Sequence, residues 1–109
     1  MPIIDGYDYK NEICIDLKEL GADIIFYTHP WFVDVHKIPP SITSEFALTC
    51  AVSYGFNLVE SKCWGTTTPR NFCSNLWTMF AESKWHKPFY ENGTNLKNKD
   101  ILFVTGYPK

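Results

Sequence analysis

The chain has 109 residues, of which 17% are aromatic and 20% charged, and its formal net charge is −2. This length allows one domain with a modest core and excludes two domains joined by a linker, so residues 1–109 are expected to form a single domain. The sequence contains neither an apolar run long enough to cross a bilayer nor the features of a secretory signal, which predicts a cytoplasmic protein with no membrane partner.

Charge is distributed unevenly along the chain. Residues 1–60 contain nine acidic residues and three lysines, whereas residues 61–109 contain three acidic and seven basic residues. Such polarity can steer a charged partner towards one end of a protein. The four cysteines lie in apolar stretches without Cys-x-x-Cys spacing, so they are interpreted as reduced, buried side chains.

The first predicted element is a helix over residues 9–20. Apolar residues recur there at steps of three and four, and Gly21 follows as a natural stop. A strand is the alternative for this segment, because Ile13, Ile15 and Leu17 also alternate.

The middle of the chain predicts two strands followed by a helix. "DIIFYT" at 23–28 is a run of β-forming residues, and "WFVDV" at 31–35 alternates after the break at Pro30. Residues 41–56 have helical spacing of their apolar residues, a possible Ser or Thr cap and Gly55 as a stop, so a largely buried helix is expected there.

The last part of the chain predicts a strand at 56–61, a helix from Thr68 to Trp85, a hairpin or loop at 89–96 and a strand at 100–107. Taken together, these elements predict a mixed α/β (α+β) fold. About four strands form one sheet, and about three helices pack on it.

One candidate catalytic pair lies at the end of the second predicted strand. In an extended segment Asp34 and His36 share a face, so the carboxylate could orient the imidazole of a general base, with His29 nearby in the sequence. The chain has no nucleophile motif, phosphate-binding loop or spaced metal ligands, and neither a cofactor nor a metal is expected. A small hydrolase or nuclease that uses these residues is therefore the alternative function, and turn and strand-end positions are the simpler explanation of the histidines.

The most extensive polar pattern is a series of six acidic residues near the N-terminus. Their steps of three and four would place them on one side of a helix, where like charges cost a few tenths of a kcal/mol per pair. Tyrosines in the same segment add aromatic groups that commonly anchor a partner. The predicted partner-binding residues are Asp5, Tyr7, Asp8, Tyr9, Glu12, Asp16, Glu19 and Asp23.

These patterns predict a non-enzymatic protein that binds a basic partner protein through its acidic N-terminal part. The most specific form of this hypothesis is an inhibitor or immunity protein that neutralises a toxin nuclease, because active sites that handle nucleic acid are basic. An ordinary solvated surface is the simpler explanation of the acidic series. A third hypothesis, nucleic-acid binding by the basic C-terminal half, is disfavoured because its basic residues are dispersed and the sequence pI is about 5.8.

Overall fold

The structure is a computed structural model of the chain that describes residues 7–8, 10–28, 38–52, 72–93 and 96–106. The two α-helices among these residues are α1 (Pro40–Thr43) and α3 (Lys87–Gly93), and the two 3-10 helices are η1 (Cys73–Asn75) and η2 (Lys99–Ile101). The strands are β1 (Tyr7–Asp8), β2 (Ile13–Cys14), β3 (Ile24–Tyr27), β4 (Leu48–Val52), β5 (Thr78–Ala81) and β6 (Leu102–Val104). None of the helices in these ranges has the length and apolar character needed to cross a membrane.

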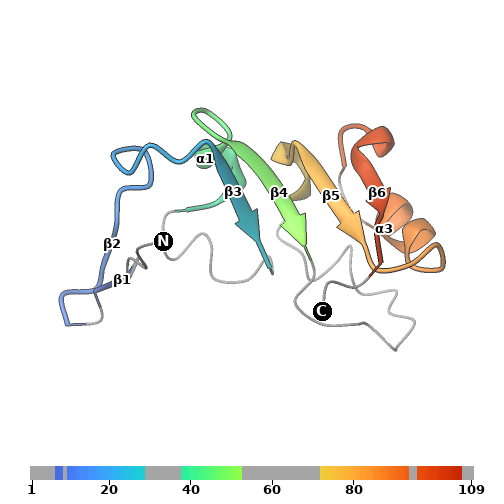
Figure 1. Cartoon of the computed structure of the whole chain (residues 1–109), viewed down its shortest axis with the longest axis horizontal. Helices are drawn as coiled ribbons and strands as arrows, with labels where there is room; N and C mark the ends of the chain where they lie inside the picture. The colour runs from blue at the N-terminus through green and yellow to red at the C-terminus, as the bar shows by residue number, and fades with distance from the viewer. Residues whose placement is uncertain (1–6, 9, 29–37, 53–71, 94–95, 107–109) are drawn as a thin grey trace.

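A parallel sheet with its strands in sequence order forms the centre of the molecule. The strands β3, β4, β5 and β6 lie side by side and run in one direction, while β1 and β2 form a small antiparallel hairpin beside them (Figure 1). Ile24 pairs with Leu48, Cys50 with Thr78 and Met79 with Leu102, so successive strands are offset by 24, 28 and 23 residues. The three offsets are similar in size, although the sequence shows no internal repeat.

One face of the sheet forms the core. Tyr27, Ala51, Met79 and Leu102 pair across the four strands, and all four are buried. Because side chains alternate along a strand, these four side chains point to the same face of the sheet, called the inner face below. Residues from the segments that connect the strands pack against this face. Phe72, Cys73 and Leu76 come from the segment around η1, and Tyr90 comes from α3.

The other face, called the outer face below, carries the alternate residues. Phe26, Cys50 and Thr78 pair across three strands, and Val52, Phe80 and Phe103 form the next row. Parallel sheets usually have both faces covered. On this face Cys50 and Thr78, in the two central strands, are buried, whereas Ile24, Phe26, Leu48 and Phe103 are all more than 40% exposed.

The predicted helix over residues 9–20 is wrong, because the chain forms the β1–β2 hairpin and then a series of turns. Asp8 Oδ1 accepts hydrogen bonds from the backbone N–H groups of Lys10 and Asn11, and Asp16 Oδ1 does the same for Lys18 and Glu19. Such local bonds offer the backbone an alternative to a helix. Glu12 also has a φ of 54°, which a right-handed helix cannot accommodate.

The helix predicted within 41–56 is also wrong. In the described part of this range, up to residue 52, only the single turn of α1 is helical, and Leu48–Val52 is the strand β4. The predicted burial is correct for Thr49, Cys50 and Ala51 but not for Leu48, which is exposed. An uncharged buried run has the same composition in a core helix and in a central parallel strand, which explains the error.

Two errors affect the C-terminal half. In the part of the predicted helix from Thr68 to Trp85 that the structure describes, η1 and β5 occur instead. Residues 89–93, predicted as hairpin or loop, belong to α3, where Pro88 lies in the first turn and needs no N–H partner. The strands expected at 23–28 and 100–107 are confirmed as β3 and β6, whereas those at 31–35 and 56–61 lie outside the described residues.

Candidate functional site

The described members of the acidic series are all exposed, but they do not share a helix face. Asp8 and Glu12 belong to the hairpin, whereas Asp16, Glu19 and Asp23 lie in the turns that lead to β3. The hydrogen bonds from Asn11, first from its side chain at 2.7 Å and then from its backbone, lower the pKa of Asp8. Asp8 and Asp16 therefore have a local structural role, because each accepts backbone hydrogen bonds that stabilise a turn.

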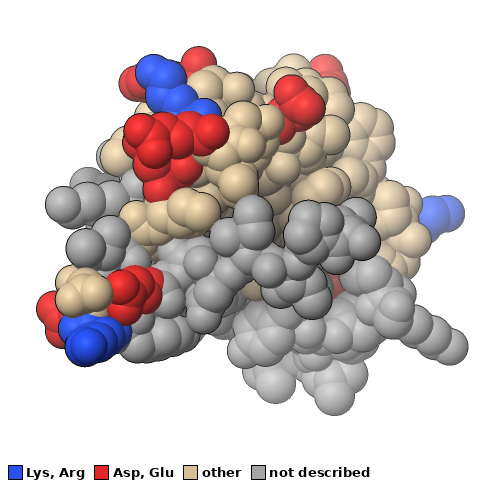
Figure 2. Space-filling model, turned by 60° about the vertical axis from the view of Figure 1, so that its left-hand side comes forward, with Lys and Arg blue, Asp and Glu red and all other residues tan. Residues whose placement is uncertain are grey.

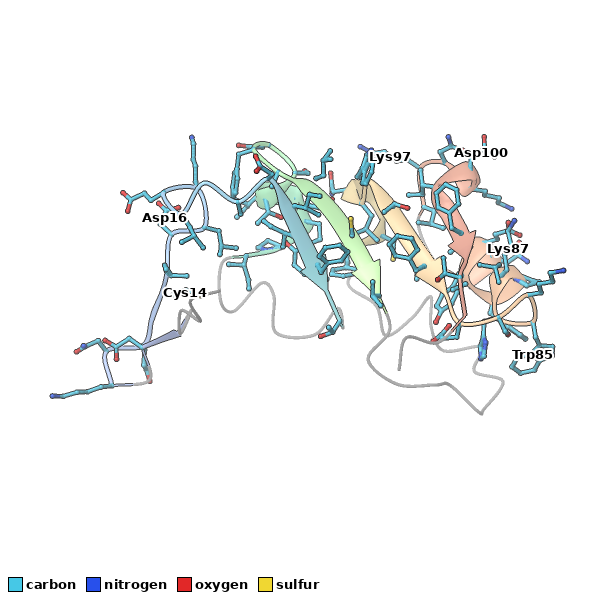
Figure 3. All side chains as sticks on the ribbon, viewed as in Figure 1. Cys14, Asp16, Trp85, Lys87, Lys97 and Asp100 are labelled. Carbon is cyan, nitrogen blue, oxygen red and sulfur yellow. The ribbon has the colours of Figure 1, made fainter. Side chains whose placement is uncertain are left out.

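Acidic side chains gather at the edge where the parallel strands begin. Asp23 directly precedes β3, and its carbonyl oxygen accepts a hydrogen bond from the N–H of Leu48, at the start of β4. Glu45 precedes β4 by three residues, and Asp100 lies in η2 immediately before β6. The edge where the strands begin is at the top of the figures. Figure 2 shows acidic side chains along it, and Figure 3 shows Asp16 near its left end and Asp100 near its right end. Lysines also occur there, including Lys97, so the edge is mixed in charge with an excess of acids.

The remaining predicted site residues are only partly described. Tyr7 pairs with Cys14 in the backbone register of the β1–β2 hairpin. Asp5, Tyr9, His29, Asp34 and His36 lie outside the described residues, so the partner-binding role of the first two and the catalytic hypothesis for the others stay predictions. The described ranges hold no group of three potential metal ligands.

The outer face provides apolar surface that the sequence patterns did not identify. Its exposed aromatic residues include Phe26, 61% exposed on the edge strand β3, and Phe103, 53% exposed on β6. Trp77, which directly precedes β5, is 55% exposed. Single exposed apolar residues are ordinary, but several on one side of a sheet are typical of a binding surface.

A pocket of about 590 Å³ opens on the β5–β6 part of this face. Trp77, Phe80 and Phe103 supply aromatic walls, and the ring centroids of Phe80 and Phe103 are 6.5 Å apart. Among the described residues that line it, Asp100 is the one that carries a charge. A volume of this size lies within the range of ligand and side-chain sites in proteins.

A second polar cluster joins β5 to α3. Tyr90 donates to the carboxylate of Glu82, with oxygen distances of 3.0 and 2.9 Å, and Ser83 Oγ lies 2.9 Å from His86 Nδ1. Glu82 and His86 are each only 4% exposed. Ser83 Oγ also accepts from the backbone N–H groups of Trp85 and His86, so it caps the turn before α3. This cluster therefore stabilises the connection after β5.

Comparisons with known protein families, with curated proteins and with solved structures found no match to this chain.

Proposed function

We propose that this protein is a non-enzymatic protein-binding module whose partner presents a basic surface. The observation that carries the proposal is the outer face of the parallel sheet, where Phe26, Trp77 and Phe103 are each more than half exposed. Large aromatic side chains of this kind supply much of the binding energy at protein interfaces.

Charge gives the expected partner its chemistry. The strand-start edge that borders the outer face carries Asp16, Glu19, Asp23, Glu45 and Asp100, all of them exposed. A basic surface that meets this edge would be attracted to it and oriented over the adjacent apolar face. A toxin nuclease is the most specific partner of this kind, and inhibition or immunity would follow from covering its basic active site.

Affinity capture tests the outer face first. The protein is immobilised and used to isolate partners at low salt, in parallel with Phe26→Thr and with Trp85→Leu as the matched control. Trp85 is 53% exposed and follows β5, so it lies near the ends of the strands and away from the strand-start edge where Asp100 lies (Figure 3). A basic protein retained by the wild type and the control, and lost with Phe26→Thr, supports the proposal. The proposal is contradicted if the Phe26→Thr variant retains the partner as well as the wild type does, or if a nucleic acid is captured reproducibly.

The isolated partner then tests the acidic edge. Asp16→Asn combined with Glu19→Gln removes two charges while keeping an oxygen that can accept the turn hydrogen bonds of Asp16. We expect the association rate at low salt to fall by roughly two- to fivefold, with a smaller change in the dissociation rate. An association rate that is unchanged by this double substitution and insensitive to salt would remove the electrostatic part of the proposal.

A further inference from the structure

The described lining of the pocket between β5 and β6 combines aromatic side chains with one carboxylate. Phe80 and Phe103, which pair in the β5–β6 register, line it together with Trp77 just before β5, and Asp100 lines it from η2. Lys97 and Lys99 are neighbours of Asp100 in the sequence, but neither is among the lining residues. The charge on the described part of the lining is therefore negative.

Hydrogen bonds fix the backbone that carries these side chains. The N–H of Trp77 donates to the carbonyl oxygen of Thr49 at 2.8 Å, which ties the start of β5 to β4. Thr78 Oγ1 donates to the Ile101 carbonyl oxygen at 2.9 Å and joins the two sides of the pocket. Asn98 Oδ1 accepts from the N–H of Asp100 at 2.9 Å and fixes the turn on which Asp100 lies.

The negatively charged face of an aromatic ring attracts a cation, and a carboxylate completes the attraction with a charge-assisted hydrogen bond. We propose that this pocket binds an arginine side chain of the protein partner, held between the aromatic rings and paired with Asp100. Arginine fits better than lysine, because its planar guanidinium stacks on rings and is less strongly hydrated than an ammonium group. The inference rests on the proposed function, since it assigns one anchor of the basic partner to one place on the outer face.

The test uses a defined probe, the blocked peptide acetyl-Gly-Arg-Gly-amide, with its citrulline counterpart as a neutral control of the same shape. Binding is followed by NMR through the indole N–H signal of Trp77, which a Trp77→Phe variant identifies, and through the backbone signals of residues 98–105. We expect saturable shifts of these signals with the arginine peptide and much smaller shifts with the citrulline peptide.

Variants assign the binding to the pocket. Asp100→Asn and Trp77→Leu should each weaken the arginine peptide roughly two- to fivefold, since an exposed ion pair or cation–π contact is worth up to about 1 kcal/mol. The matched controls are Glu91→Gln and Trp85→Leu, which remove a charge and an indole outside the pocket and should leave the affinity unchanged.

Two outcomes would overturn the inference. One is equal binding of the citrulline and arginine peptides, which would mean that charge has no part in recognition. The other is a set of shifts that leaves the Trp77 indole and residues 98–105 unaffected. Either result could occur while Phe26→Thr still abolishes capture of the partner, in which case the proposed binding function would stand without an arginine pocket.

The opposite combination is also informative. If the arginine peptide binds the pocket as expected but Phe26→Thr does not affect capture of the partner, the result counts against the proposed function alone.

Discussion

Cys50 lies on the outer-face row between Phe26 and Thr78, yet it is only 2% exposed. Burial raises the pKa of its thiol, because the thiolate is poorly solvated there. The nucleophilic species is the thiolate, so both its small population and its inaccessibility slow chemical modification. Cys14 in β2 is only partly buried and provides an internal comparison.

We predict that iodoacetamide at pH 8 modifies Cys14 roughly ten times faster or more than Cys50 under native conditions. Mass spectrometry of proteolytic fragments measures each site in the same sample. Cys73, buried to the same extent, should follow Cys50. In urea the rates should converge, and fast modification of Cys50 in the native protein would show that the sheet does not shield it.

At the scale of elements, Tyr27 connects β3 to the segment that contains α1. Its hydroxyl hydrogen-bonds the Ile38 carbonyl oxygen at 2.7 Å and the Thr43 hydroxyl, and its ring packs edge-on against Phe72 with centroids 5.4 Å apart. Tyr27→Phe keeps the ring and removes both hydrogen bonds. We expect it to lower the free energy of unfolding by about 1–2 kcal/mol in urea titrations, while Trp85→Phe on the surface stays within about 0.5 kcal/mol of the wild type.

The same residue gives a pH dependence. Burial raises the pKa of the Tyr27 phenol, an effect that the hydrogen bond with Thr43 partly offsets. Because the pKa is higher in the folded than in the unfolded protein, this contribution to stability is complete below the ordinary tyrosine pKa of about 10 and is lost as the pH rises through the folded value. Urea titrations from pH 8 to 11 should therefore show a larger alkaline loss for the wild type than for Tyr27→Phe. Parallel curves would argue against a buried, neutral phenol.

An element could be predicted when the sequence pattern within the element itself indicated its structure, and not when distant parts of the chain determined it. β3 and β6 are short apolar runs with turn residues before them, and the sequence predicted both. β4 is stabilised by β3 and β5, which come from distant parts of the chain, so the uncharged run around Cys50 favoured a helix on local spacing alone. The regular spacing of the acids in residues 8–19 arose from consecutive turns, in which Asp8 and Asp16 accept backbone hydrogen bonds.

The candidate site was predictable only in its charge. Exposed acids at Glu19 and Asp23 were expected from the sequence, and the structure places them near the edge where β3 begins. Trp77, Phe103 and Asp100 were not expected to share a pocket, because nothing local indicates that β5 and β6 pair in parallel. The terminal strand was predicted, but its residues are all apolar, so the sequence did not indicate that Leu102 is buried while Phe103 and Val104 are exposed.

At the scale of the whole molecule, the sheet predicts a graded pattern of amide hydrogen exchange. β4 and β5 have strand partners on both sides, whereas β3 and β6 each have one within the four-stranded sheet. We expect amides of β4 and β5 to exchange roughly ten times more slowly, or slower still, than the outward-pointing amides of β3 and β6. NMR or mass spectrometry on native protein measures this. Equal protection of all four strands would imply that both edges of the sheet are covered.

The sequential strand order also constrains how the chain can fold. Each pairing in the sheet joins residues 23 to 28 positions apart, so none can form as a local hairpin. The entropy of closing such a loop is lost before a pairing contributes any energy, which makes folding slower than that of a helical protein of equal length. Since the three loops are of similar size, no pairing has a large entropic advantage as the nucleus. Folding can therefore start at any neighbouring pair and extend one strand at a time, with an unpaired edge at every intermediate stage.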